Sequence, residues 1–194
     1  MALCREGDEV VLPSPYWVTY REQPVLARAT VKPLTCRSEH GFLIQPEQLR
    51  TVLTKNTRVV RNHRACPRPP PAHIFPSQLL LCNPSNPTGA MYSQAQLEAL
   101  AAVLSEPAYQ HIWIISDEIY HQLVVEPDTP SPICFATLPG MQARTIVIDG
   151  VSKAYAMTGF RLGWMVAPST VATACAKLQG QTTSCASSVS QAVR

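Results

Sequence analysis

The stretch Gly150-Val-Ser-Lys-Ala-Tyr-Ala-Met-Thr-Gly-Phe-Arg-Leu-Gly163 places a lysine, Lys153, just after Thr145–Asp149, a run typical of a buried strand. Most lysines lie on solvated surfaces, and taken alone Lys153 would be one of them by roughly ten to one. Burial disfavours a charged amine, however, and this turns a lysine into a nucleophile toward an aldehyde. Arg161, further along the same stretch, has a guanidinium that can hold a phosphate with two hydrogen bonds. The stretch therefore combines a candidate nucleophile with a candidate phosphate ligand.

Strand and helix patterns alternate on both sides of this stretch. The segments expected to be extended are Glu9–Leu12, which ends at Pro13, then Arg28–Leu34, His111–Ser116, Thr145–Asp149 and Leu162–Val166. The expected helices are Pro46–Leu53, Ser93–Leu104 and one that begins within Ser169–Leu178. Such alternation is typical of an α/β fold, and it predicts a mostly parallel sheet with flanking helices.

The helix expected at Ser93–Leu104 has the clearest signals. Ser93 and Gln96 have the spacing of a capping box, in which each side chain bonds the other residue's backbone amide. The apolar positions recur at helical spacing and form one face: Leu97, Leu100, Ala101 and Leu104. This face predicts a helix that packs against the sheet.

Three further motifs precede the lysine stretch: Pro13-Ser-Pro-Tyr-Trp17, Asn83-Pro-Ser-Asn-Pro-Thr-Gly89 and Ser116-Asp-Glu-Ile-Tyr120. The lysine stretch resembles the lysine signature of class I aminotransferases. The three other motifs resemble, in the same order, that family's aromatic segment over the cofactor ring, its SNPTG loop and its D-E-x-Y element. The resemblance implies that residues 1–194 are a partial large domain of a fold type I enzyme that uses pyridoxal 5'-phosphate.

The resemblance also implies a set of site residues. Those assigned to the cofactor are Trp17, Asn86, Asp117, Tyr120, Ser152, Lys153 and Arg161. Lys153 would link covalently to pyridoxal phosphate and then move the proton at the substrate's Cα. Asp117 would keep the ring nitrogen protonated, although without the other motifs it would be a strand-end cap. Asn86 and Tyr120 would bond the ring's 3-oxygen.

The remaining residues would hold the ring face and the phosphate. Trp17 would stack on the ring, with an ordinary core tryptophan as the alternative. Arg161 would pair with the phosphate, together with hydroxyls such as that of Ser152. The family often has a serine three residues before the lysine, where this chain has Gly150. Either Ser152 substitutes for that serine or one phosphate contact is missing. The resemblance implies no metal.

The segment Thr183-Ser-Cys-Ala-Ser-Ser-Val-Ser-Gln191 resembles the TSGASSISQ stretch of bacterial-type aspartate and prephenate aminotransferases, with Cys185 in place of glycine. It implies transamination between an amino acid of the aspartate, glutamate or prephenate type and a 2-oxo acid. Two alternatives stay open: another fold type I enzyme, such as a lyase or a synthase, and a non-catalytic cofactor-binding remnant. The resemblance implies homodimeric full-length relatives about twice as long, whose other segments carry the clamp for the substrate carboxylate and most of the phosphate site. We therefore expect that the chain by itself does not turn over amino acids.

Residues 61–78, RNHRACPRPPPAHIFPSQ, depart from the pattern around them. Thr57–Val60 is typical of the start of a buried strand and Leu79–Cys82 of its continuation. The proline-rich tract between them cannot continue a central strand. The sequence predicts a disordered insertion, such as a translated intron, by about four to one over a partner-binding polyproline segment or a site that uses His63, Cys66 and His73.

Composition narrows the function classes. The chain is 46% hydrophobic and 15% charged, which suits a folded domain. A net charge of +3 is too small to indicate nucleic-acid or membrane binding. Seven cysteines without a CxxC pair argue against a disulfide framework or a zinc ribbon and favour a reducing compartment, such as the cytoplasm or a plastid. The first residues lack the apolar core of a signal peptide, but they resemble the middle of a domain and so give no information about targeting.

Overall fold

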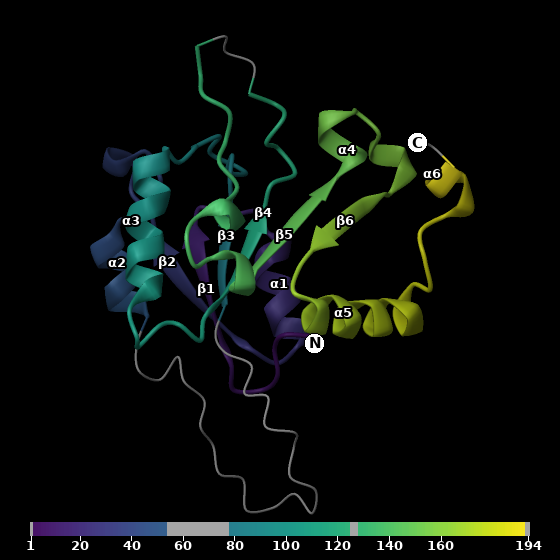
Figure 1. Ribbon diagram of the computed structural model, residues 1–194, viewed down its shortest axis with the longest axis horizontal. Helices are drawn as coiled ribbons and strands as arrows, with labels where there is room; N and C mark the ends of the chain where they lie inside the picture. The colour runs from purple at the N-terminus through teal and green to yellow at the C-terminus, as the bar shows by residue number, and fades with distance from the viewer. Residues whose placement is uncertain (1, 54–77, 125–127, 193–194) are drawn as a thin grey trace, which may run out of the picture.

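The described part of the chain forms one six-stranded sheet with helices around it (Figure 1). The computed structural model describes residues 2–53, 78–124 and 128–192. The strands are β1 (Glu9–Ser14), β2 (Thr30–Thr35), β3 (Gln78–Cys82), β4 (Trp113–Asp117), β5 (Thr145–Gly150) and β6 (Gly163–Val166). Their order is β2-β1-β3-β4-β5-β6, and all neighbours are parallel except β5 and β6. The predicted mostly parallel α/β fold is confirmed.

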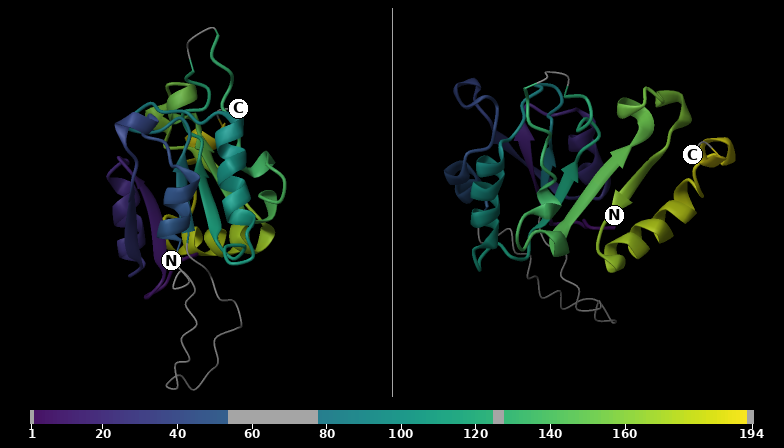
Figure 2. Two further views of the ribbon diagram at one scale, coloured as in Figure 1. Left: turned by 90° about the vertical axis from the view of Figure 1, so that its left-hand side faces the viewer. Right: turned by 45° about the horizontal axis from the view of Figure 1, so that its top comes forward.

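Six helices and four short 3-10 turns accompany the strands of the described chain. The helices are α1 (Thr19–Leu26), α2 (Pro46–Val52), α3 (Gln94–Ser105), α4 (Val151–Ala154), α5 (Ser169–Thr182) and α6 (Ser188–Ala192). The 3-10 turns are η1 (Ser38–His40), η3 (Phe135–Thr137), η4 (Gln142–Arg144) and η5 (Thr158–Phe160). Helices α5 and α6 follow β6 and lie well away from α2 and α3 (Figures 1 and 2). None of the helices described here is both long and apolar enough to cross a bilayer.

A separate hydrophobic cluster packs on each face of the sheet. Successive residues of a strand point to opposite faces, so Val11 joins the larger cluster and Leu12 the smaller one. The larger cluster receives the apolar residues of α2 and α3, while the smaller one receives Tyr20 from α1. Helices α2 and α3 therefore cover one face of the sheet, and α1 contacts the other.

Strand β1 continues past the point expected from the sequence. It was predicted to end at Pro13, but its register with β2 runs on through Ser14, opposite Thr35. The Ser14 carbonyl then accepts a hydrogen bond from the amide of Cys36 at 2.8 Å. The register with β3 covers only Val10 and Val11. Pro13 is tolerated because β1 has left its inner neighbour by that point.

The capping signals gave correct helix starts. Ser93 caps α3. Its hydroxyl accepts from the Gln96 backbone amide at 3.3 Å, and its own backbone amide donates to the Gln96 side-chain oxygen at 2.8 Å. All four residues of the predicted apolar face are buried. Helix α2 begins at Pro46, as predicted, and ends at Val52.

Helix α1 was not predicted. It has no side-chain cap at Val18 and contains Pro24, which removes a hydrogen-bond donor from its interior. Tyr20 and Pro24 are its buried residues, so packing against the sheet rather than local propensity accounts for it.

The predicted insertion lies mostly outside the described residues, which omit 54–77. Its last residue, Gln78, was placed in the insertion but belongs to β3. Gln78 is buried and pairs with Val10 on one side and Trp113 on the other. The continuation expected from Leu79 thus includes Gln78, because both neighbouring strands extend far enough to pair with it, while the expected start at Thr57–Val60 lies outside the described residues.

Candidate functional site

The predicted motifs meet at the carboxyl edge of the parallel strands. Parallel strands bring the loops that follow them to a common edge, where open α/β sheets bind ligands. The amide of Asn83, after β3, donates to the carbonyl of Asp117 at 3.1 Å. The amide of Glu118, after β4, donates to the carbonyl of Ile148 in β5 at 2.9 Å. Backbone hydrogen bonds therefore join the loop after β3 to the end of β4, and the loop after β4 to β5.

Asp117 lies half-buried at the end of β4. Its Oδ2 accepts a hydrogen bond of 2.6 Å from the hydroxyl of Tyr20, and its Oδ1 accepts one of 3.1 Å from the amide of Ile119. Burial raises the pKa of Asp117 above its ordinary value, the two hydrogen bonds oppose that rise, and the nearby charge of Asp149 adds to it. The carboxylate is held in one orientation at the edge of the sheet.

Sequence reasoning missed Tyr20. Its side chain is 5% exposed, and burial raises the pKa of its hydroxyl well above the ordinary tyrosine value. Its ring meets that of Trp17 edge-on, with centroids 5.5 Å apart and planes at 88°. Trp17 is itself 45% exposed, so it is not an ordinary core tryptophan. The signal for Tyr20 was its position one helical turn after Trp17, and it was lost because α1 was not predicted.

A second group joins the other two motifs. The side-chain amide of Asn86 donates to the Tyr120 hydroxyl at 3.2 Å. The amine of Lys153 lies 5.7 Å from the centroid of the Tyr120 ring. Among the residues that the structure describes, no carboxylate forms an ion pair with Lys153. Lys153 is itself exposed, so the burial expected from its place after a strand is not found, and no described acid neutralises its amine.

The two predicted phosphate ligands lie in separate turns. Ser152 is half-buried in α4. Arg161 is exposed in a left-handed conformation with φ 52°, and its Nη1 donates to the carbonyl of Thr158 at 2.9 Å. That bond keeps the guanidinium within its own turn, so no hydrogen bond joins Arg161 to the Lys153 group in the described structure.

Gly150 has a steric reason to be glycine. A Cβ built on it would lie 2.8 Å from the carbonyl oxygen of Leu162 and 3.0 Å from the Cα of Gly163. Both contacts are to backbone atoms where the antiparallel strand β6 begins, at Gly163 and at the residue before it, and this backbone cannot move aside cheaply. The serine that the family often has at this position does not fit here, which leaves Ser152 as the hydroxyl nearest in sequence to Lys153.

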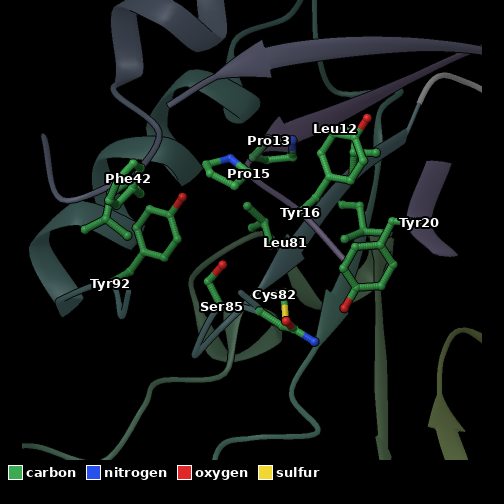
Figure 3. Close-up of a pocket in the computed structure, with 13 residues that line it drawn as sticks. Leu12, Pro13, Pro15, Tyr16, Tyr20, Phe42, Leu81, Cys82, Ser85 and Tyr92 are labelled. Atoms are coloured by element: carbon green, nitrogen blue, oxygen red, sulfur yellow. The ribbon is translucent and has the colours of Figure 1, made fainter. Parts of the chain in front are cut away.

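Two hollows border the site. The first has a volume of about 20 Å³, and Figure 3 shows Tyr16, Tyr20, Ser85 and Cys82 among its lining. That volume suits about one water molecule. The second is about 430 Å³ and more open, with Pro84, Gly89 and Tyr120 among its lining residues. Tyr120 and the loop that carries Asn86 thus line the same space, which is large enough for a small molecule.

The polar side chains at this edge indicate what kind of ligand could bind there. A fixed carboxylate, a phenol paired with an amide and an amine occupy one edge of the sheet. Together they suit a planar ring that has a basic nitrogen, an oxygen substituent and an aldehyde. The described residues contain no cluster of three or more His, Cys, Asp or Glu side chains arranged to bind a metal.

Comparison with known proteins agrees with the geometry. The profile of the family "Aminotransferase class I and II" matches residues 1–194. A bifunctional aspartate aminotransferase and glutamate/aspartate-prephenate aminotransferase of Petunia hybrida is 41% identical over 191 residues. An aspartate/prephenate aminotransferase of Cereibacter sphaeroides is 38% identical over 194 residues. The crystal structure of the aspartate aminotransferase from Rhizobium meliloti superposes with a TM-score of 0.81 at 34% identity.

These matches cover nearly all of this chain but less than half of each relative. The Petunia match covers 98% of this chain and 35% of the relative. The Cereibacter match covers 98% and 42%, and the Rhizobium structure likewise 98% and 42%. The six-stranded sheet therefore corresponds to part of a known aminotransferase structure.

Proposed function

The chain belongs to the class I and II aminotransferase family, and we propose that it binds pyridoxal phosphate through Lys153 for transamination of a dicarboxylic amino acid with a 2-oxo acid. Enzymes of this family use pyridoxal phosphate. The observation that carries the proposal is Asp117, a half-buried carboxylate fixed by Tyr20 at the same edge as Lys153. Such a carboxylate is suited to hold a proton on a basic ring nitrogen.

The proposed roles follow from the chemistry of each side chain. Pyridoxal phosphate supplies, when bound, an electron sink for the carbanion at the substrate's Cα. Asp117 holds a proton on the ring nitrogen, and the 2.6 Å bond from Tyr20 keeps its carboxylate oriented. Tyr120 and Asn86, already bonded to each other, donate to the ring oxygen. The amine of Lys153 takes the proton from the substrate's Cα and delivers it to the carbon of the cofactor.

The ring face and the phosphate take the remaining residues. Trp17 offers an exposed aromatic surface next to Tyr20 and Asp117 for stacking. Ser152 and Arg161 lie on either side of Lys153 in the chain, and we assign them to the phosphate. Arg161 would have to exchange its bond to Thr158 for a bidentate bond to the phosphate, and the charge-assisted bond is the stronger of the two.

The substrate assignment rests on the relatives and on one segment. Both quoted relatives are named for aspartate and prephenate aminotransferase activity. Residues 183–191 resemble the matching segment of that group. We therefore assign aspartate or glutamate as amino donor, and a 2-oxo acid, including prephenate, as acceptor.

A reducing compartment suits the proposed enzyme. Six cysteines of the described chain, Cys4, Cys36, Cys82, Cys134, Cys175 and Cys185, are free thiols. The quoted relatives come from a plant and from bacteria. We assign the cytoplasm or a plastid on this basis.

Exchange of the substrate's Cα proton tests the function directly. In heavy water with pyridoxal phosphate, the chain should exchange the Cα hydrogen of aspartate or glutamate faster than pyridoxal phosphate alone does, as followed by NMR. Lys153→Ala should abolish the excess, while Lys177→Ala, which removes an exposed lysine, should leave it intact. Equal exchange by the chain and by Lys153→Ala would refute the assigned role. Release of ammonia and an elimination product in place of exchange would indicate a lyase.

A further inference from the structure

Asp149 connects the two turns that hold the candidate site. Its Oδ1 accepts a hydrogen bond of 2.7 Å from the amide of Gly150, at the start of the turn that leads to Lys153. Its Oδ2 lies 3.7 Å from the Nδ1 of His121, in the turn that follows β4. The side chain of Asp149 is 14% exposed. A carboxylate this well buried needs partners on both oxygens, and it has one on each turn.

His121 is also held by Glu118, through the same ring nitrogen that approaches Asp149. The Nδ1 of His121 lies 2.7 Å from the carbonyl oxygen of Glu118, and its backbone amide donates to the same oxygen at 2.9 Å. A carbonyl oxygen can only accept, so Nδ1 carries a hydrogen whatever the charge of the ring. That hydrogen is donated to Glu118, and the same nitrogen lies 3.7 Å from Asp149, beyond hydrogen-bond distance. The contact between His121 and Asp149 is therefore electrostatic.

These contacts close a ring between β4 and β5. The amide of Glu118 donates to the carbonyl of Ile148 at 2.9 Å, which joins the two strands a second time. Tyr120 lies inside the ring, between Glu118 and His121. Lys153 follows Gly150 by less than one helical turn. The ring thus includes the turn that carries Tyr120 and the start of the turn that carries Lys153.

A purely local explanation would treat each bond by itself. The bond from Gly150 to Asp149 joins neighbours, and the bond from His121 to Glu118 closes a single turn. Neither local bond requires His121 and Asp149 to approach each other. They do approach, and within the described residues His121 is the one basic side chain within ion-pair distance of Asp149.

We propose that Asp149 and His121 are positioning residues, which hold the Tyr120 turn and the Lys153 turn at a fixed separation. This role rests on the function proposed above. Neither residue contacts the reacting atoms. Their effect is on the placement of the Lys153 amine, now 5.7 Å from the Tyr120 ring centroid. A site displaced by a fraction of an ångström loses rate without losing its fold.

The test combines a cofactor readout with one that needs no cofactor. The first is the rate at which Lys153 is labelled by pyridoxal phosphate and borohydride, measured by mass spectrometry. The second is hydrogen exchange at the backbone of residues 150–153 in the free chain. The variants are Asp149→Ala, Asp149→Asn, His121→Ala and the double variant Asp149→Ala with His121→Ala. Glu39→Gln serves as the control, because it removes an exposed carboxylate that pairs with Arg37.

Asp149→Ala should slow labelling about tenfold and speed exchange at Gly150, as expected for a contact pair. Asp149→Asn keeps an acceptor for the Gly150 amide, so hydrogen exchange at Gly150 should stay slow. Its rate of Lys153 labelling should fall by the same factor as that of His121→Ala. The double variant should be labelled no more slowly than Asp149→Ala, because each single variant already removes the contact between His121 and Asp149. Single variants within about twofold of the parent chain, or losses that add, would overturn the proposal. A parent chain that is not labelled at Lys153 would refute the proposed function instead, and hydrogen exchange in the four variants would still decide whether the two residues are coupled.

Discussion

At Asp117, burial and hydrogen bonding act on the same carboxyl group in opposite directions. Burial raises its pKa, while the bond from the Tyr20 hydroxyl favours the ionised form and lowers it. Tyr20→Phe removes the donor and keeps the ring against Trp17. The pKa of Asp117 should therefore rise in the variant, as measured by carbon-13 NMR titration of the free chain. An unchanged titration would mean that the bond has no influence on the charge of Asp117.

The same balance predicts that Asp117 opposes folding at neutral pH. A carboxyl whose pKa is higher in the folded state contributes stability below its unfolded pKa, and that contribution is lost as pH rises through the folded value. Asp117→Asn keeps the shape and an acceptor for Tyr20 but does not titrate. Because its amide cannot also accept from Ile119, the expected signature is the pH dependence: its melting temperature relative to the parent should rise as pH increases from below the ordinary aspartate pKa of 3.8 to pH 7.

Asp117→Asn should at the same time damage the chemistry. Loss of the charge that holds the ring nitrogen protonated should slow Cα proton exchange by a factor on the order of a hundred. A variant that is more stable and equally active would show that Asp117 is a strand-end cap and not a cofactor ligand.

Seven site residues were named from motifs, and the structure brings some of them into contact. Asn86, Tyr120 and Lys153 form one group, because their loops follow neighbouring parallel strands. Tyr20 could not be predicted, since its role depends on a helix that lacks a cap and contains a proline. The orientation of Arg161 also depends on its left-handed backbone, which no pattern in the sequence indicates.

Among the elements, the contact between β5 and β6 limits the size of the residue at position 150, three residues before Lys153. Gly150→Ala places a Cβ 2.8 Å from the Leu162 carbonyl oxygen and should destabilise the fold by about 1–3 kcal/mol in urea unfolding. Gly159→Ala is the matched control, because a Cβ there meets nothing within 4 Å. Gly150→Ser should be no better, and it should not tighten pyridoxal phosphate binding. A stable Gly150→Ser chain that binds the cofactor more tightly would contradict the steric explanation.

Strands and capped helices were predictable because their signals are local. The apolar runs that became β4 and β5 and the capping box of α3 each specify their element without tertiary contacts. The antiparallel direction of β6 was not predictable, since direction depends on how the turn through η5 returns the chain. The extension of β1 past Pro13 likewise depends on β2, which pairs with it from the edge.

For the whole molecule, the proline-rich segment provides a test of the fold. Because Gln78 belongs to β3, the deletion that preserves the sheet removes residues 61–77 and joins Val60 to Gln78. A shorter connection lowers the entropy lost on closing the loop, by about 1 kcal/mol. The shortened chain should unfold at the same or a higher urea concentration, with unchanged circular dichroism. A chain that unfolds on deletion would show that the segment is structural.

Covalent capture of pyridoxal phosphate tests the central claim, that Lys153 holds the cofactor. The purified chain is mixed with pyridoxal phosphate, reduced with borohydride and digested for peptide mapping. The chain has three other lysines, Lys32, Lys55 and Lys177, and none lies in a comparable motif. Lys177 is an apt competitor, since it is exposed and would react by accessibility alone. Our account predicts label on Lys153, with Tyr20→Phe and Asp117→Asn reducing its yield. Label spread over the lysines, or concentrated on Lys177, would contradict it.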